Sequence, residues 1–296
     1  MSKLLIIDGF SVFGLNIKFY GLLIAIGFAL GVIFVSKLAP KKGFDSGIAF
    51  DLVLIVFPSA IIGARIGYVL FHLENYPTFV SMLKVWEGGL MIYGGVLFSA
   101  ITLLIYCKVK KYNFFKVCDL IVPALILGQA LGRWGNFFNQ EAYGSLVTNT
   151  NLQWFPFSVW IENGHFTDEA KIQLVNAYGT SDVTGAWFNA TFFYESFWCL
   201  IGFVLLFLLS KKTDKIGVLT AVYFAYYGIE RFFVEMLRTD SLYLGPIKIS
   251  VLLSGIFVLA GATYLIYLFI ISKKQNFAVD KVGKSVETKK ENQIQK

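Results

Sequence analysis

Residues 128–144 combine closely spaced glycines with polar side chains at the end of a long apolar run. In a helix, Gly128, Gly132 and Gly135 share one face, where a neighbouring helix can approach closely. An arginine near the middle of a bilayer costs roughly 2.5–3.5 kcal/mol on insertion scales. Arg133 therefore needs a partner inside the protein, and its planar fork of donors suits a phosphate or a carboxylate. A structural Arg–Glu pair that locks two helices is the simpler interpretation.

A second group of polar residues lies at helical spacing further along the chain. Tyr227, Arg231, Glu235 and Arg238 are separated by four, four and three residues, so they share one helical face. We expect Glu230 to point elsewhere and to pair with a neighbouring helix. Together with Arg133, this face would supply a cationic site within an apolar protein.

The composition indicates which kind of fold holds these residues in position. Of 296 residues, 56% are hydrophobic and 15% charged, too few polar groups to cover a water-soluble fold. A spanning helix needs about 20 apolar residues. We therefore predict an all-α polytopic membrane protein with seven transmembrane helices, at about 19–38, 51–72, 89–106, 117–137, 189–210, 216–237 and 249–272.

The lysines predict the orientation of these helices. Alternate connections and the tail after residue 272 hold 17 lysines, whereas the opposite side holds five. Because lysine marks the cytoplasmic side, the N-terminus is expected outside and the C-terminus in the cytoplasm. Residues 1–272 would form the membrane domain, with 138–188 as a small extracytoplasmic cap between helices 4 and 5. Residues 273–296 would be a basic, disordered cytoplasmic tail.

Arginine follows a different pattern from lysine. The four arginines, Arg65, Arg133, Arg231 and Arg238, lie in or at the edge of spanning runs. In the predicted orientation each lies in the outer half of its helix, so we expect them to converge at one depth. Snorkelling of the side chain to the interface is the alternative for Arg65 and Arg238.

Other chemical groups are expected at the same depth. Tyr20 lies near the outer end of the first helix, and Tyr93 with Gly94 and Gly95 opens the third. The glycines permit close approach of either a ligand or a helix. A cationic, partly dry site that opens sideways to lipid suits a phospholipid headgroup, because arginines can hold its phosphodiester and stabilise a departing phosphate.

Several function classes are disfavoured. The net charge of +7 could suggest nucleic acid, but the lysines follow topology, so we predict no nucleic-acid partner. There is no Walker loop, HExxH or GxSxG motif. Cys107, Cys118 and Cys199 show neither CxxC spacing nor a disulfide pattern, and we predict no metal site and no cofactor.

The stretch from Arg133 to Gly144 reads RWGNFFNQEAYG. It resembles the signature R-x-G-N-F-x-N-x-E-x-x-G of the bacterial prolipoprotein diacylglyceryl transferase family, with every fixed position filled. The run from Tyr227 to Arg238 is similar to that family's sixth helix, and Tyr20-Gly21 and Gly63-Ala64-Arg65 also fit. The resemblance covers roughly residues 15–270.

The resemblance implies a specific activity in lipoprotein biogenesis. The family transfers a diacylglyceryl group from phosphatidylglycerol to the lipobox cysteine in the signal peptide of a prolipoprotein. A thioether forms and glycerol phosphate leaves, at the outer leaflet of the bacterial cytoplasmic (inner) membrane. The implied partners are therefore phosphatidylglycerol, prolipoproteins and the lipid bilayer, and the protein would be a multi-pass enzyme.

The resemblance also implies roles for individual residues. Arg133 and Arg231 would bind phosphate and stabilise the leaving group, and Glu235 would orient Arg231 or Arg238. The remaining expected substrate-binding residues shape or line the headgroup pocket: Tyr20, Gly94, Gly95, Asn136, Asn139, Glu141, Gly144 and Tyr227.

Tyr93 occupies a position where many family members have a histidine that is proposed to activate the thiol. An unperturbed phenol, with a pKa of about 10, is a poor base at neutral pH. We expect the positive site to lower the pKa of the incoming thiol, with Tyr93 or Glu141 relaying the proton. His72 and His165 lie near the interface and in the cap, where a histidine is usually only solvated.

Two other functions compete with the transferase. A transporter of anionic solutes would also place arginines in a bundle, but the ionisable residues stop in the outer half and no inverted repeat of broken helices is evident. A structural membrane subunit would use Arg–Glu pairs to join helices, and would tolerate lysine at position 133.

Overall fold

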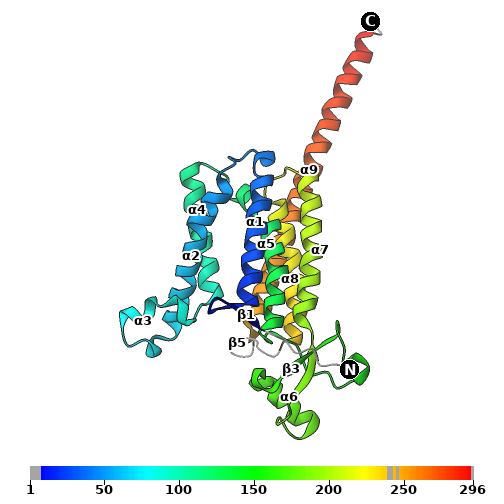
Figure 1. The fold of residues 1–296 in the computed structure, drawn as a ribbon. Helices are drawn as coiled ribbons and strands as arrows, with labels where there is room; N and C mark the ends of the chain where they lie inside the picture. The colour runs from blue at the N-terminus through cyan, green and yellow to red at the C-terminus, as the bar shows by residue number, and fades with distance from the viewer. Residues whose placement is uncertain (1–7, 239–242, 245–246, 295–296) are drawn as a thin grey trace.

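The computed structural model describes residues 8–238, 243–244 and 247–294 and is mostly helical (Figure 1). Its long helices are α1 (Phe19–Leu38), α2 (Ile48–Phe71), α4 (Ile92–Lys110), α5 (Phe114–Phe138), α7 (Thr191–Lys212), α8 (Val218–Leu237) and α9 (Ile249–Ile294). Shorter helices are α3 (Phe79–Leu83), α6 (Asp168–Tyr178) and 3-10 turns at Pro40–Lys42, Leu73–Asn75, Val85–Glu87, Thr150–Leu152 and Asn163–His165. The long helices begin and end within about four residues of the predicted runs, except that α9 continues beyond the predicted end at residue 272.

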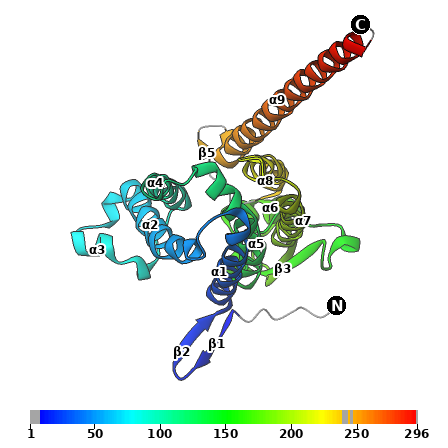
Figure 2. The same ribbon diagram turned by 90° about the horizontal axis from the view of Figure 1, so that it is seen from above.

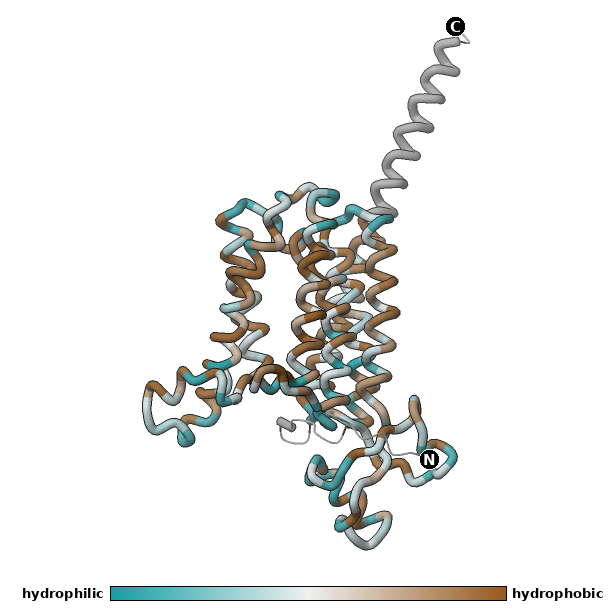
Figure 3. The backbone as a smooth tube through the Cα atoms, in the orientation of Figure 1, coloured by the Kyte–Doolittle hydropathy of each residue, from teal (hydrophilic) through white to brown (hydrophobic). Residues whose placement is uncertain are grey.

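Six of the long helices are apolar and long enough to cross a membrane, which fits a multi-pass membrane protein. The exception is α8, whose 20 residues include Glu230, Arg231 and Glu235. Large apolar side chains such as Phe57, Leu104 and Leu205 lie exposed on the outside of the bundle, as lipid-facing residues do. In Figure 3, which colours the backbone by hydropathy, hydrophobic residues predominate along the length of these helices.

The long helices form two groups (Figures 1 and 2). One group packs α1 on α5, α5 on α7, α7 on α8 and α8 on α9, while α2 and α4 form a separate pair. Glycines allow this pair to come close, because a Cβ on Gly94 would collide with the carbonyl oxygen of Gly63. A Cβ on Gly95 would lie 3.1 Å from the carbonyl oxygen of Ala60.

A partly buried carboxylate fixes the beginning of α8. The two oxygens of Asp119, on α5, accept hydrogen bonds from the backbone nitrogens of Gly217 (2.5 Å) and Thr220 (2.8 Å) and from the Thr220 hydroxyl. These bonds satisfy free N–H groups of the first turn and place a negative charge at its positive end. Asp119 thereby fixes how α8 lies along α5.

The segment between α5 and α7, for which an extracytoplasmic cap was predicted, folds into a small unit that we call the cap. Strand β3 (Ser158–Glu162) pairs antiparallel with β4 (Gly185–Asn189), and α6 packs beside them. Tyr143, Phe188 and Leu174 are almost completely buried there, so the cap has its own apolar core. The cap lies where α5 and α8 end and α7 begins (Figure 1).

Two expectations differ from the structure. The all-α prediction missed three two-stranded antiparallel sheets: β3–β4, β1 (Gly9–Val12) with β2 (Leu15–Lys18), and β5 (Tyr243–Leu244) with β6 (Ile247–Lys248). All three lie outside the spanning runs, where helical periodicity gives no information. The tail predicted to be disordered continues α9 as far as Ile294. The tail contains no proline and one glycine, a composition that a helix tolerates.

Candidate active site

One buried carboxylate connects three arginines from two helices. Glu195, in the second turn of α7, is 1% exposed. Its Oε2 lies 2.5 Å from Nη2 of Arg133 on α5, and its Oε1 lies 3.3 Å from Nη1 of Arg231 on α8. The same Oε1 is 3.7 Å from Nη1 of Arg238, which directly follows α8. The predicted convergence of Arg133, Arg231 and Arg238 is therefore observed.

A second carboxylate completes the arrangement, which we call the arginine cluster: Arg133, Arg231, Arg238, Glu195 and Glu235. Glu235 Oε2 lies 2.6 Å from Nη2 of Arg231, one helical turn away, and Glu235 is as deeply buried as Glu195. The three arginine side chains keep between 12% and 20% of their surface exposed. A guanidinium has five donors in a planar fork, a geometry that suits an anion such as a phosphate.

The end of α5 turns into a short polar loop. The side-chain amides of Asn136 and Asn139 both donate to Oε1 of Glu141, at 3.0 and 3.2 Å. Helix α5 ends at Phe138, and Gln140 and Ala142, just beyond it, have positive φ angles that a continuing helix does not allow. Three of the predicted pocket residues are therefore in direct contact with one another.

Gly144 connects this loop to the end of α8. It forms an antiparallel bridge with Arg238, and its nitrogen donates to the carbonyl oxygen of Asn189 at 2.9 Å. A Cβ at Gly144 would lie 2.8 Å from Asn189 Cβ and 2.9 Å from Thr191 Cγ2. Glycine is required here because the cap, α7 and the end of α8 pack closely around Arg238.

Two predicted tyrosines border the same region. The ring of Tyr20, at the start of α1, lies against Gly135 on α5. The ring of Tyr227 stacks on Tyr223, with centroids 5.6 Å apart and planes 7° apart. The Tyr223 hydroxyl accepts a hydrogen bond from Nε2 of Gln129 at 2.9 Å, which ties α8 to α5 one turn from Arg133.

We expect Gly135→Ala to lower activity by about tenfold, because a Cβ would lie 2.5 Å from Tyr20 Cδ2 and displace that ring. Gly132→Ala is the matched control on the same helix, since its Cβ would meet nothing within 4 Å. Transferase turnover of the two variants, measured at equal amounts of folded protein, checks this expected difference. Equal activities would show that the position of Tyr20 does not matter.

The structure places other predicted residues apart from the cluster. Arg65 is 4% exposed and donates to the carbonyl oxygens of Met82, Gly88, Gly89 and Ser81, so it holds the loop after α2. The expectation that all four arginines converge is wrong for Arg65. Its alternative, snorkelling to the interface, does not apply either, because the loop folds over it.

Tyr93, Gly94 and Gly95 lie in the first turn of α4, which packs on α2. The glycines contact Gly63 and Ala60 of α2, as described above. Within the described residues, no hydrogen bond joins the Tyr93 side chain to the arginine cluster. The glycine pair therefore serves helix packing in this structure, and its predicted contact with substrate remains a prediction.

Comparison with known proteins identifies the family. The chain matches the sequence profile of the family described as prolipoprotein diacylglyceryl transferase over residues 9–267. A phosphatidylglycerol–prolipoprotein diacylglyceryl transferase 1 from Clostridium perfringens (strain 13 / Type A) is 40% identical over 90% of this chain and 95% of its own length. The chain belongs to this family. Relatives with the same enzyme name from Clostridium botulinum (strain Langeland) and Clostridium kluyveri are 39% and 36% identical over 90% and 88% of the chain, and over 97% and 95% of their own lengths.

Sequence reasoning missed Glu195, which joins the arginines of this diacylglyceryl transferase family member. The signal was available, because Glu195 is the lone charged residue between Lys171 and Lys211 apart from Asp182. An ionisable residue inside a spanning run is by default a functional residue with a partner. The partners of Glu195 could not be identified from the sequence, because the sequence does not show which face of α7 points inward or which helices pack against it.

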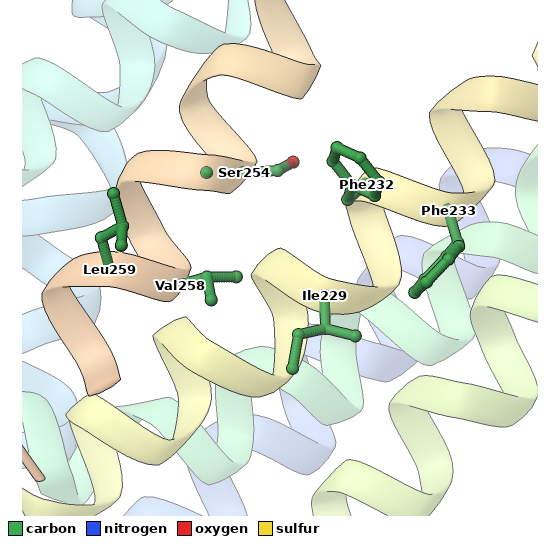
Figure 4. A pocket seen from close by; sticks show the side chains of 7 residues that line it. Ile229, Phe232, Phe233, Ser254, Val258 and Leu259 are labelled. Atoms are coloured by element: carbon green, nitrogen blue, oxygen red, sulfur yellow. The ribbon is translucent and has the colours of Figure 1, made fainter. Parts of the chain in front are cut away.

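An apolar pocket of about 330 Å³ lies between α8 and α9 (Figure 4). It is lined by Ile229, Phe232 and Phe233 of α8 and by Val258 and Leu259 of α9, among others. Helical spacing puts these α8 residues on the face opposite Arg231. The pocket has no charged lining, so it cannot serve as the headgroup site of a diacylglyceryl transferase.

Proposed function

We propose that this protein transfers the diacylglyceryl group of phosphatidylglycerol to the lipobox cysteine of prolipoproteins. The proposed setting is the outer leaflet of the bacterial cytoplasmic membrane, with seven spanning helices including α8. The N-terminus would be outside and the C-terminus in the cytoplasm. Residues 1–272 would form the transferase domain, with 138–188 as its extracytoplasmic cap and 273–296 as a cytoplasmic extension.

The arginine cluster carries this proposal. Three guanidinium groups from two helices lie around Glu195, on the cap side of the bundle, and retain partial exposure. With two carboxylates against three guanidiniums, the arginine cluster itself has one net positive charge. Lys248 adds positive charge beside it, because its Nζ donates to the carbonyl oxygen of Glu235 at 2.9 Å. This positive charge suits the negatively charged phosphodiester of a lipid. Partial burial strengthens such an interaction, since the surroundings screen charge less than water does.

The chemistry follows from this placement. The cysteine sulfur attacks the carbon of the diacylglycerol unit that is bonded to the phosphate oxygen. A C–S bond forms, and the bond between that carbon and the phosphate oxygen breaks. The phosphate gains a second negative charge as glycerol phosphate leaves. Arg133 and Arg231 would stabilise that growing charge by directed hydrogen bonds, and Glu195 and Glu235 would hold both guanidiniums in place. The thiol proton is released in the same step.

Mass analysis tests the proposal directly. A lipobox peptide is incubated with phosphatidylglycerol and membranes that contain this protein, and the expected result is the added mass of one diacylglyceryl group on cysteine. A peptide with serine in place of that cysteine is the control. Unmodified peptide in the presence of folded protein would instead favour a structural subunit or a transporter.

Two residues remain proposed for the thiol proton. Glu141 is the better placed, because it accepts hydrogen bonds from Asn139 and from Asn136, which lies one turn after Arg133 on α5. We expect Tyr93→Phe to change turnover by less than about threefold, as surface changes away from a site do. Glu141→Gln is expected to lower turnover by about a hundredfold, within the range for a lost proton-transfer group. The reverse order of effects would assign the relay to Tyr93.

A further inference from the structure

Glu230 is a buried carboxyl group that the proposed chemistry does not use. It lies on α8 directly before Arg231 and is 3% exposed. Neither of its carboxyl oxygens has a hydrogen-bond partner among the described residues. Glu195 and Glu235, by contrast, are both paired with arginine. We expected Glu230 to pair with a neighbouring helix, and no such pair is present within the described chain.

Glu230 is nevertheless close to the arginine cluster. Electrostatic interactions reach it from Arg133 on α5, from Glu195 and Cys199 on α7, and from groups on its own helix and just beyond. Those last groups are Arg231, Arg238, Tyr223, Tyr226 and Tyr227. Its charge therefore affects the same site that would bind the phosphodiester.

An isolated ionised carboxylate is costly in such a place. Burial without hydrogen bonds or a paired cation disfavours the charged form strongly, and the group instead becomes neutral by holding a proton. Glu195 opposes an ionised Glu230, whereas the three guanidiniums favour one, so the burial of Glu230 without a hydrogen-bond partner is what favours the neutral form. An ionised Glu230 would bring three carboxylates against three guanidiniums and cancel the net positive charge, whereas a protonated Glu230 leaves that charge intact.

We propose that Glu230 holds a proton in the resting enzyme and so keeps one net positive charge on the arginine cluster for the phosphodiester of the lipid. Glu230 is in this sense a positioning residue, since it acts through the charge of the arginines and does not touch the substrate. The role of this proton rests on the proposed function, which the proposal deepens. The proton itself can be detected without a measurement of transferase activity.

Infrared spectroscopy of the full chain in phosphatidylglycerol vesicles tests the protonation state. The difference spectrum of wild type minus Glu230→Gln should contain the C=O stretch of a protonated carboxylic acid, and this band should shift in D₂O. Glu162→Gln, at an exposed position in the cap, is the control and should remove only carboxylate bands. Carboxylate bands in the Glu230 difference would overturn the proposal, even if the transferase activity is confirmed.

Kinetics test the consequence for the site. Glutamine is neutral and nearly isosteric with protonated glutamate, so Glu230→Gln should keep kcat/KM for phosphatidylglycerol within about threefold. The same substitution at Glu195 removes a paired charge and should lower kcat/KM for phosphatidylglycerol by at least about a hundredfold. Loss of kcat in Glu230→Gln with an unchanged KM would show that an ionised Glu230 acts as a base, and the proposal would be wrong. An inactive wild type would refute the proposed function and leave the infrared result standing.

Discussion

Replacement of Arg133 by lysine is expected to lower kcat/KM for phosphatidylglycerol by about 10²–10³-fold, the range for a lost donor to a developing oxyanion. Arg133 contacts Glu195 at 2.5 Å while a fifth of its side chain stays exposed, so one planar group faces both a carboxylate and the proposed phosphate. Lysine keeps the charge but supplies a single, strongly hydrated ammonium without the fork of donors. The change therefore tests geometry rather than charge.

Two matched variants separate this effect from a general loss of folding. Arg65→Lys alters an arginine that holds a loop through backbone carbonyls, so it should reduce thermal stability but leave kcat/KM per folded protein unchanged. Arg238→Lys should lower kcat/KM less than Arg133→Lys does, because Arg238 lies 3.7 Å from Glu195 whereas Arg133 lies 2.5 Å from it. If Arg133→Lys kept wild-type kinetics, Arg133 would be only part of an Arg–Glu link between α5 and α7.

The spanning helices and the arginine face were predictable because both depend on local sequence. Twenty apolar residues require a helix in lipid, and Arg231, Glu235 and Arg238 share a face by spacing alone. The boundaries of α8, Val218–Leu237, lie within two residues of the prediction despite its charges. Those charges are also the reason that α8 differs from the other long helices in apolar character.

The pairing of helices could not be predicted in the same way. Arg65 has the same residue type and depth as Arg133, and only the packing of α2 on α4 shows that it holds a loop. Tyr93 likewise appeared at the level of the site, but its helix belongs to the α2–α4 pair. Glu195 was overlooked for the same reason, since the contacts that define its role come from α5 and α8.

Substitution of Glu195 by glutamine is the second change with a large expected effect, and it should lower both stability and activity. Removal of one partner from a buried ion pair typically costs about 3–5 kcal/mol, because the remaining charge stays buried. Here three guanidiniums would remain beside one carboxylate, Glu235, which contacts Arg231. Thermal unfolding in detergent without phosphatidylglycerol measures the first effect, and the peptide assay measures the second.

An anionic lipid should partly reverse the loss in Glu195→Gln. If the cluster binds a phosphodiester, phosphatidylglycerol supplies the negative charge that glutamine lacks, so it should raise the melting temperature of the variant more than that of wild type. Phosphatidylcholine, whose headgroup has no net charge, is the control. Equal shifts with both lipids would mean that Glu195 joins α5, α7 and α8 without taking part in an anion site. A larger shift with phosphatidylglycerol would locate the headgroup at the arginines by a measurement that requires no catalysis.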